Sequence, residues 1–178
     1  ISNYGILTMT NSIVSGNRAD AGGGGINNYT GNVTLTNSTV SGNRSARSGG
    51  GILNDGSLMI LTTITVSGNT AAWGGGITNT RRTLPLTNST VSGNTAQTQW
   101  GGGIFNKNAG TVTLTNRTVS WNEAPYNGGG IFSNGNKGVV TLCNSTVSRN
   151  MAYNGGGMFL DHGTVTLTNS TVSGNTGM

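Results

Sequence analysis

LTNSTVSGN at residues 35–43 recurs unchanged at 86–94 and 167–175. Near-copies stand at four further places, which are 9–17, 61–69, 114–122 and 142–150. The asparagine that closes each copy recurs every 25 to 28 residues. A glycine triplet followed by Ile or Met keeps the same spacing, as in GGGI at 49–52. A repeat of this length is typical of a solenoid, in which each repeat forms one coil.

Short strands are predicted within each repeat. In NVTLTN, residues 32–37, apolar and polar residues alternate, so Val33 and Leu35 share one face, and this alternation indicates a β-strand. STVSGN predicts a second strand, and GGGIxN predicts a third in which glycine lets backbones approach closely. No stretch has the apolar period of a helix. We therefore predict an all-β right-handed parallel β-helix (β-solenoid) of seven coils, with three short strands per coil.

The coils form one predicted domain over residues 1–178, because the repeat register runs through the whole chain. Coils start near residues 1, 26, 52, 77, 104, 131 and 158. Three apolar columns predict the inside. They are Met9, Leu35, Leu61, Leu86, Leu114, Leu142 and Leu167; Val14, Val40, Val66, Val91, Val119, Val147 and Val172; and Ile26, Ile52, Ile77, Ile104, Ile131 and Met158. A single coil buries little, so only stacking creates a continuous core.

Asparagine columns have a related cause, because a stacked Asn side chain can bond both its neighbours and the local backbone. The predicted structural column is Asn17, Asn43, Asn69, Asn94, Asn122, Asn150 and Asn175. A second column runs through Asn11, Asn37, Asn88, Asn116, Asn144 and Asn169, and Thr63 interrupts it. A third begins with Asn3, Asn28, Asn54, Asn79 and Asn106.

The phrases GGGI and TLTNSTVSGNTA resemble the repeats of secreted bacterial β-helix proteins, which include adhesins, autotransporter passengers and polymorphic outer-membrane proteins. The resemblance covers the whole chain. It implies the solenoid fold and an extracellular or cell-surface location. It implies little about activity, because this fold carries adhesins, structural fibres, lyases and ice-binding proteins alike.

Charge and composition exclude several classes of function. The net charge is +5, but the nine Lys and Arg residues are scattered, which disfavours a nucleic-acid interface. No apolar run approaches the ~18 residues that span a bilayer, so no membrane span is predicted in this segment. The weak positive charge is compatible with attraction to a surface polysaccharide.

Catalysis and metal binding are not expected, because the four acidic residues stand in different coils. These residues are Asp20, Asp55, Glu123 and Asp161, in the first, third, fifth and seventh coils. Coils lie ~4.8 Å apart, so neighbouring acids are roughly 10 Å apart and cannot share a sugar or a Ca²⁺ ion. Asp161 and His162 form the only tempting dyad, and they are sequence neighbours in a turn. We predict no enzyme activity, no metal and no cofactor.

Two outward surfaces are candidates for binding. Stacked Thr-x-Thr pairs would give a flat array suited to ice or carbohydrate, formed by Thr8, Thr10, Thr34, Thr36, Thr113, Thr115, Thr166 and Thr168. Alternation turns three phenylalanines outward, and with other aromatic residues they form a candidate contact surface of Phe105, Phe132, Phe159, Tyr126, Tyr153, Trp73 and Trp100. Covering turns and core edges is the alternative role for these side chains. Trp121 and Arg149 replace the Gly of SGN in adjacent coils, which indicates a solvent-facing position.

The predicted function is an extracellular structural or adhesive solenoid. The chain opens and closes within a coil, and an open terminal coil offers unpaired backbone groups to another strand. We therefore expect either adjoining coils of a longer chain or a head-to-tail homopolymer that grows into a filament or surface fibre. The predicted end-to-end interface includes Ile1, Asn3, Asn175 and Met178. A carbohydrate-binding or ice-binding module is the alternative.

Overall fold

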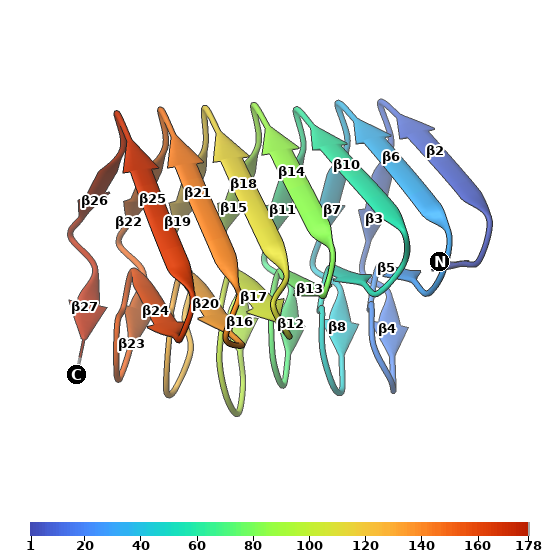
Figure 1. The fold of residues 1–178 in the computed structure, drawn as a ribbon. Helices are drawn as coiled ribbons and strands as arrows, with labels where there is room; N and C mark the ends of the chain where they lie inside the picture. Colours follow the sequence, from blue (N-terminus) through green and yellow to red (C-terminus); the bar gives the residue numbers. More distant parts are fainter. Residues whose placement is uncertain (178) are drawn as a thin grey trace.

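Coils stack along one axis in the computed structural model, which describes residues 1–177 (Figure 1). Each coil pairs with the next through parallel strands, and three sheets of seven strands run the length of the molecule. No helix occurs among residues 1–177. The predicted all-β parallel solenoid of seven coils is therefore confirmed.

Two of the long sheets enclose the core from two sides. Sheet A contains β1 (Ser2–Asn3), β5 (Ile26–Asn28), β9 (Ile52–Asn54), β13 (Ile77–Thr80), β17 (Ile104–Lys107), β20 (Ile131–Asn134) and β24 (Met158–Asp161). Sheet B contains β2 (Ile6–Thr10), β6 (Asn32–Thr36), β10 (Leu58–Thr62), β14 (Thr83–Thr87), β18 (Thr111–Thr115), β21 (Val139–Cys143) and β25 (Thr164–Thr168).

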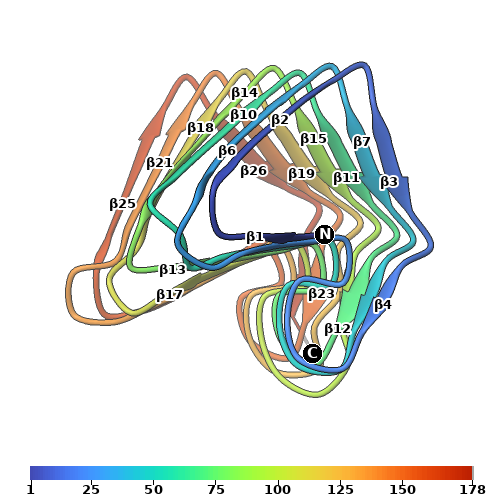
Figure 2. The same ribbon diagram turned by 90° about the vertical axis from the view of Figure 1, so that its right-hand side faces the viewer.

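The third long sheet closes a triangular cross-section, which is visible along the solenoid axis (Figure 2). Sheet C contains β3 (Ile13–Ser15), β7 (Thr39–Ser41), β11 (Thr65–Ser67), β15 (Thr90–Ser92), β19 (Thr118–Ser120), β22 (Thr146–Ser148) and β26 (Thr171–Ser173). Strands predicted from the three repeated phrases thus form the three sides of the triangle.

A fourth, short strand in most coils was not predicted. Sheet D consists of β4 (Arg18–Ala19), β8 (Arg44–Ser45), β12 (Thr70–Ala71) and β16 (Thr95–Ala96), and a separate pair is formed by β23 (Met151–Ala152) and β27 (Thr176–Gly177). Glu123 bridges both Thr95 and Met151, so it links the two parts of this sheet. After sheet D the chain makes a loop that projects beyond the triangle before it enters sheet A (Figure 2). We call this loop the lobe.

The core is built from the predicted columns. Leu142 and Val147 in coil 6 are fully buried, as are their equivalents in coils 2 to 5 to within one per cent. In coil 7 the same columns are open, with Leu167 46% and Val172 44% exposed. The difference arises because, within residues 1–177, only coil 6 stacks against coil 7.

The glycine triplet has three separate physical causes, which the triplet at the end of coil 3 illustrates. Gly74 has a φ of 59°, a left-handed conformation that glycine adopts without steric cost. A Cβ on Gly75 would collide with the backbone of Thr95, which belongs to a strand of sheet D in the next coil. A Cβ on Gly76 would collide with the carbonyl oxygen of Gly103 and press against the side chain of Asn94. Each glycine is therefore required where lobe, sheet D and core meet.

Two asparagine ladders run through the interior. In the first, Nδ2 of each Asn donates to Oδ1 of the Asn in the next coil and to a valine carbonyl, as Asn94 does to Asn122 (2.9 Å) and Val66 (3.0 Å). The backbone N–H of Asn94 donates to the same Oδ1 at 3.0 Å. The second ladder joins Asn3, Asn28, Asn54, Asn79 and Asn106 and ends on Ser133. In nearly every coil, the ladder asparagines thus provide hydrogen-bond partners for buried backbone groups of the turns.

The remaining asparagine column has a different role from the predicted stacking. These residues form the corner between sheets B and C, are exposed and have positive φ values of 48° to 56°: Asn11, Asn37, Asn88, Asn116, Asn144 and Asn169. Thr63 adopts the same conformation with a φ of 52°. Only Asn116 and Asn88 are joined by a side-chain hydrogen bond within residues 1–177. Asn is favoured here because it tolerates left-handed backbone better than most residues.

Arg117 breaks the pattern of the core. It takes the place of the Ser that follows the corner Asn in most repeats, and it is 3% exposed. Its Nε donates to the carbonyl oxygen of Leu86 at 2.6 Å, whereas Nη1 and Nη2 have no partner among the described residues. Burial lowers the pKa of the guanidinium to about 9. A cation without a counter-ion at this depth costs stability.

Candidate functional site

The acidic residues are as dispersed in space as their sequence positions predict. Asp20 lies near Arg18 at 3.9 Å on the surface, and Asp161 contacts its neighbour His162 at 3.0 Å. No group of three His, Cys, Asp or Glu side chains within residues 1–177 could hold a metal ion.

The threonine array lies on the outer face of sheet B. Strand register aligns the predicted residues in two columns that also include Thr62, Thr87 and Thr141. One column is Thr8, Thr34, Thr113 and Thr166, with Ile60 and Pro85 between coils 2 and 5; the other is Thr10, Thr36, Thr115 and Thr168, with Cys143 in coil 6. The array is a face of stacked hydroxyls and methyls that two apolar residues interrupt near its middle.

The phenylalanine column does not form the exposed surface that alternation suggested. Phe105 and Phe132 are each 2% exposed. They point out of the triangular core but are covered by the lobe, where Trp100 lies 5.2 Å from Phe132 between ring centroids. Phe132 stacks in turn on the half-buried Phe159 at 5.7 Å. The prediction of an exposed contact surface is wrong for Phe105 and Phe132, because the lobe forms a second apolar layer over sheet A.

The other predicted aromatic residues line two shallow hollows. Tyr126 and Tyr153 are exposed and border a hollow of about 360 Å³ with the half-buried Trp100. Trp73 is half-buried near the other end, under the ammonium group of Lys107, which lies 6.0 Å from the ring centroid. These side chains are therefore divided between two hollows, one formed by lobe residues alone and one between the lobe and sheet A.

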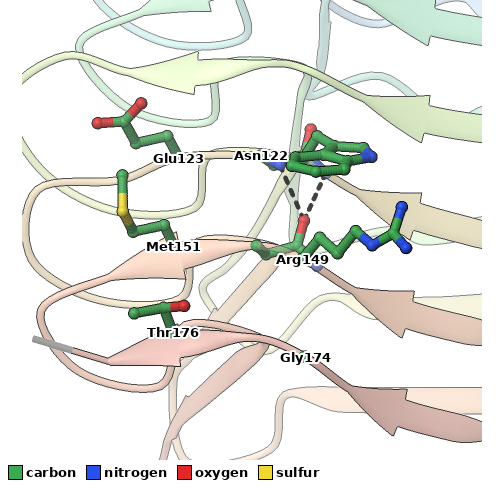
Figure 3. A pocket seen from close by; sticks show the side chains of 8 residues that line it. Asn122, Glu123, Arg149, Met151, Gly174 and Thr176 are labelled. Carbon is green, nitrogen blue, oxygen red and sulfur yellow. Dashed lines mark hydrogen bonds between the residues drawn. The ribbon is translucent and has the colours of Figure 1, made fainter.

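A third recess, of about 420 Å³, lies outside the predicted surfaces, at the turn between sheets C and D (Figure 3). One wall is the column that is glycine in five coils, occupied here by Trp121, Arg149 and Gly174. The guanidinium of Arg149 stacks over the indole of Trp121 at 5.1 Å from the ring centroid. Trp121 remains 62% exposed.

The facing wall comes from sheet D and its bridge. Glu123, Met151 and Thr176 follow one another in successive coils, and Figure 3 shows them one above the other, to the left of Arg149. Glu123 is exposed, and it makes no ion pair within residues 1–177. The floor is formed by the buried ladder residues Asn122 and Asn150.

Backbone strain marks this recess. Trp121 and Arg149 have φ values of 58° and 57°, whereas the equivalent residues of the other coils are glycines with φ values of 60° to 66°. A left-handed conformation costs a residue with a Cβ roughly 1–2 kcal/mol relative to glycine. The sequence contains a signal for this recess, because the Gly of SGN is replaced in two adjacent coils. The residues of the facing wall could be identified only from the way the coils stack.

The end residues lie on opposite coils. The amino group of Ile1 donates to the carbonyl of Gly25 at 2.7 Å, and Asn3 starts the second ladder. Asn175 ends the first ladder, since its Oδ1 accepts from Asn150 at 2.9 Å. Met178 lies outside the described residues.

Family comparison identifies the repeat. The family model of the Chlamydia polymorphic membrane protein repeat matches residues 37–55 and 88–107. Both segments start at a corner between sheets B and C and run through sheet D and the lobe to a strand of sheet A. These two segments, on a parallel β-solenoid, fit repeats of the polymorphic membrane protein type. Comparison with curated proteins and with solved structures gave no match.

Polymorphic membrane protein repeats on a parallel solenoid agree with the resemblance that the sequence indicated. Repeats of this type agree with a surface-associated repeat protein. Within residues 1–177 no helix is both long and apolar enough to cross a membrane.

Proposed function

We propose that this chain is a structural and adhesive element displayed outside a bacterial cell, with no catalytic activity. The observation that carries the proposal is the pair of polymorphic membrane protein repeats within an unbroken register of stacked coils. The exposed acids are isolated from one another, so they supply surface charge and solubility. A long, narrow solenoid of this kind presents its side chains on extended faces that a binding partner can follow.

Surface display is tested on cells that express the native protein. Antibodies against residues 1–178 should label intact, unpermeabilised cells, and added protease should remove that label. A cytoplasmic protein should stay unlabelled in the same preparation as the control. Labelling that requires lysis would contradict the proposal.

We further propose that the solenoid continues by end-to-end stacking, with coils of the same polypeptide or of a second copy. The first ladder has a direction, since each Asn donates from its N–H and Nδ2 to Oδ1 in the following coil. At coil 1, Oδ1 of Asn17 accepts from no group among residues 1–177, whereas Asn175 retains an unused backbone N–H at coil 7. Donors at one end and an acceptor at the other favour a head-to-tail contact, which propagates without closing.

Stacking is tested with the 178-residue chain in solution. Filaments with an axial repeat of about 33 Å, seven coils at ~4.8 Å, should be visible by electron microscopy. Asn17→Lys should abolish them, because a cation replaces the acceptor at an exposed position, whereas Asn32→Lys on the exposed start of β6 should not. A wild-type chain that sediments only as a monomer at high concentration, with its fold intact, would contradict end-to-end stacking between copies.

A further inference from the structure

The position of Trp121 is an open corner of the solenoid. At the equivalent Gly16, an added Cβ would meet nothing within 4 Å, and at Gly68 and Gly93 it would only touch a backbone nitrogen at 3.9 and 4.0 Å. A side chain at this column therefore points into solvent and fills no space in the core. Trp121 and Arg149 accept backbone strain without gaining burial, so stability does not explain them.

The indole is held in a defined orientation and keeps one face free. Arg149 comes from coil 6, so its guanidinium covers the face of Trp121 that looks along the axis toward coil 6. The opposite face looks toward coil 4, where the column residue is Gly93, which has no side chain that could cover the ring. An exposed, flat and pre-oriented indole is suited to stacking on the apolar face of a ring.

Polar groups of both kinds lie around the indole. The guanidinium of Arg149 offers several N–H donors, and the free carboxylate of Glu123 on the facing wall is an acceptor. The hydroxyl of Thr176 can do both, and the thioether of Met151 adds an adaptable apolar contact. Opposite charges on the two walls leave the recess without a strong preference for either an anion or a cation.

We propose that the free face of Trp121, at the edge of this recess, binds neutral hexose units of a cell-surface glycan. A hexose presents C–H groups on one face of its ring, which stack on the free face of the indole, and hydroxyls at its rim, which donate to Glu123. Stacking on Trp121 and bonding to Glu123 thus define the ligand chemistry. The inference rests on the proposed adhesive function, since it names what the displayed solenoid holds.

The experiment uses an array of neutral, sialylated and sulfated oligosaccharides, followed by calorimetric titration with the strongest neutral binder. The wild-type 178-residue chain should bind hexose-containing neutral glycans. Trp121→Gly restores the residue found in five coils, so it should keep or raise the unfolding temperature while it weakens binding about tenfold or more. Glu123→Gln should weaken binding roughly threefold, because a charged acceptor is lost.

Tyr4→Gly is the matched control, because Tyr4 is another exposed aromatic residue and lies in coil 1, far from the recess. It should leave the affinity unchanged. Failure to bind any neutral glycan, binding only to sialylated or sulfated glycans, or equal binding by wild type and Trp121→Gly would each overturn the proposal. Capture of a protein without any glycan requirement would overturn it as well. None of these results would alter antibody labelling of intact cells, so failure of this site is distinguishable from failure of surface display.

Discussion

The groove between sheet A and the lobe differs between its two halves, although the same backbone builds both. In coils 5 to 7 the column that faces the lobe is Phe105, Phe132 and Phe159, and aromatic rings fill the space. In coils 2 to 4 the same column is Asn27, Leu53 and Thr78, and a hollow of about 270 Å³ remains. Oδ1 of Asn27 and Oγ1 of Thr78 are buried there without a hydrogen-bond partner within residues 1–177.

Some columns of the solenoid must keep the same kind of residue in every coil, whereas others can vary. Columns that face the triangular core are nearly uniform, because every coil must cover its neighbours. The column that faces the lobe varies, because the lobe covers this column whether its residues are aromatic, aliphatic or polar. Variation in such positions gives one half a rigid aromatic layer and the other half a polar hollow.

The largest expected effect comes from breaking the core that both halves share. Val91→Asp would bury an unpaired carboxylate between coils 3 and 5, where Val91 is 1% exposed. We expect a loss of roughly 4 kcal/mol or more in the free energy of unfolding. Denaturant unfolding followed by circular dichroism measures it, and both halves should lose structure together. Wild-type stability in this variant would mean that the valine column is not internal.

A smaller effect should distinguish the two halves of the groove. Phe132→Ala removes the centre of the aromatic layer, and we expect a loss of about 3–5 kcal/mol from the lost burial and the cavity. Leu53→Ala should cost only about 1–2 kcal/mol, because Leu53 is half-buried beside a hollow. Chemical denaturation of the two variants tests the difference. Equal losses would show that the hollow is filled in solution.

Arg117 is a departure from the repeat inside the core, and its replacement should change stability. Arg117→Ser replaces an unpaired buried cation with the residue of most other coils, and we expect a gain of roughly 3 kcal/mol near neutral pH. The folded pKa of about 9 lies below the ordinary pKa of an arginine in the unfolded chain, so the unfolded state binds more protons above pH 9. The penalty is thus complete well below pH 9 and decreases as the pH rises through 9.

The pH dependence is measured as the difference between wild type and Arg117→Ser, so that other titrating groups cancel. Unfolding free energies should converge as the pH increases above 9. A constant difference across this range would indicate that the guanidinium keeps its proton in the folded state.

The smallest effect tests the polar half of the groove. Thr78→Val keeps the shape of the side chain and removes its unpaired hydroxyl, so we expect a gain of about 1 kcal/mol. Thr83→Val, at an exposed position in β14, should change stability by less than about 0.5 kcal/mol. Differential scanning calorimetry compares the two. A loss in Thr78→Val would show that the hydroxyl has a partner, such as an ordered water.

Sequence alone determined the parts of this protein that repeat. Leu35, Val40 and Ile52 stand at spacings that only stacked coils can bury together, and the ladder asparagines stand where parallel turns need partners. The resemblance to polymorphic membrane protein repeats could likewise be predicted from the sequence, since the matched segments contain the repeated phrases. A periodic pattern predicts the fold strongly, because the same requirement for burial recurs in the sequence of every coil.

Only the tertiary structure decided the features that occur once. Alternation turned Phe105 and Phe132 outward, but the lobe that buries them is a loop whose path no periodicity records. The recess depends equally on folding, because Trp121 and Glu123 are near in sequence while Met151 and Thr176 join them from the following coils. Alternation specifies the face of a strand, whereas exposure and site geometry depend on which segments pack against that face.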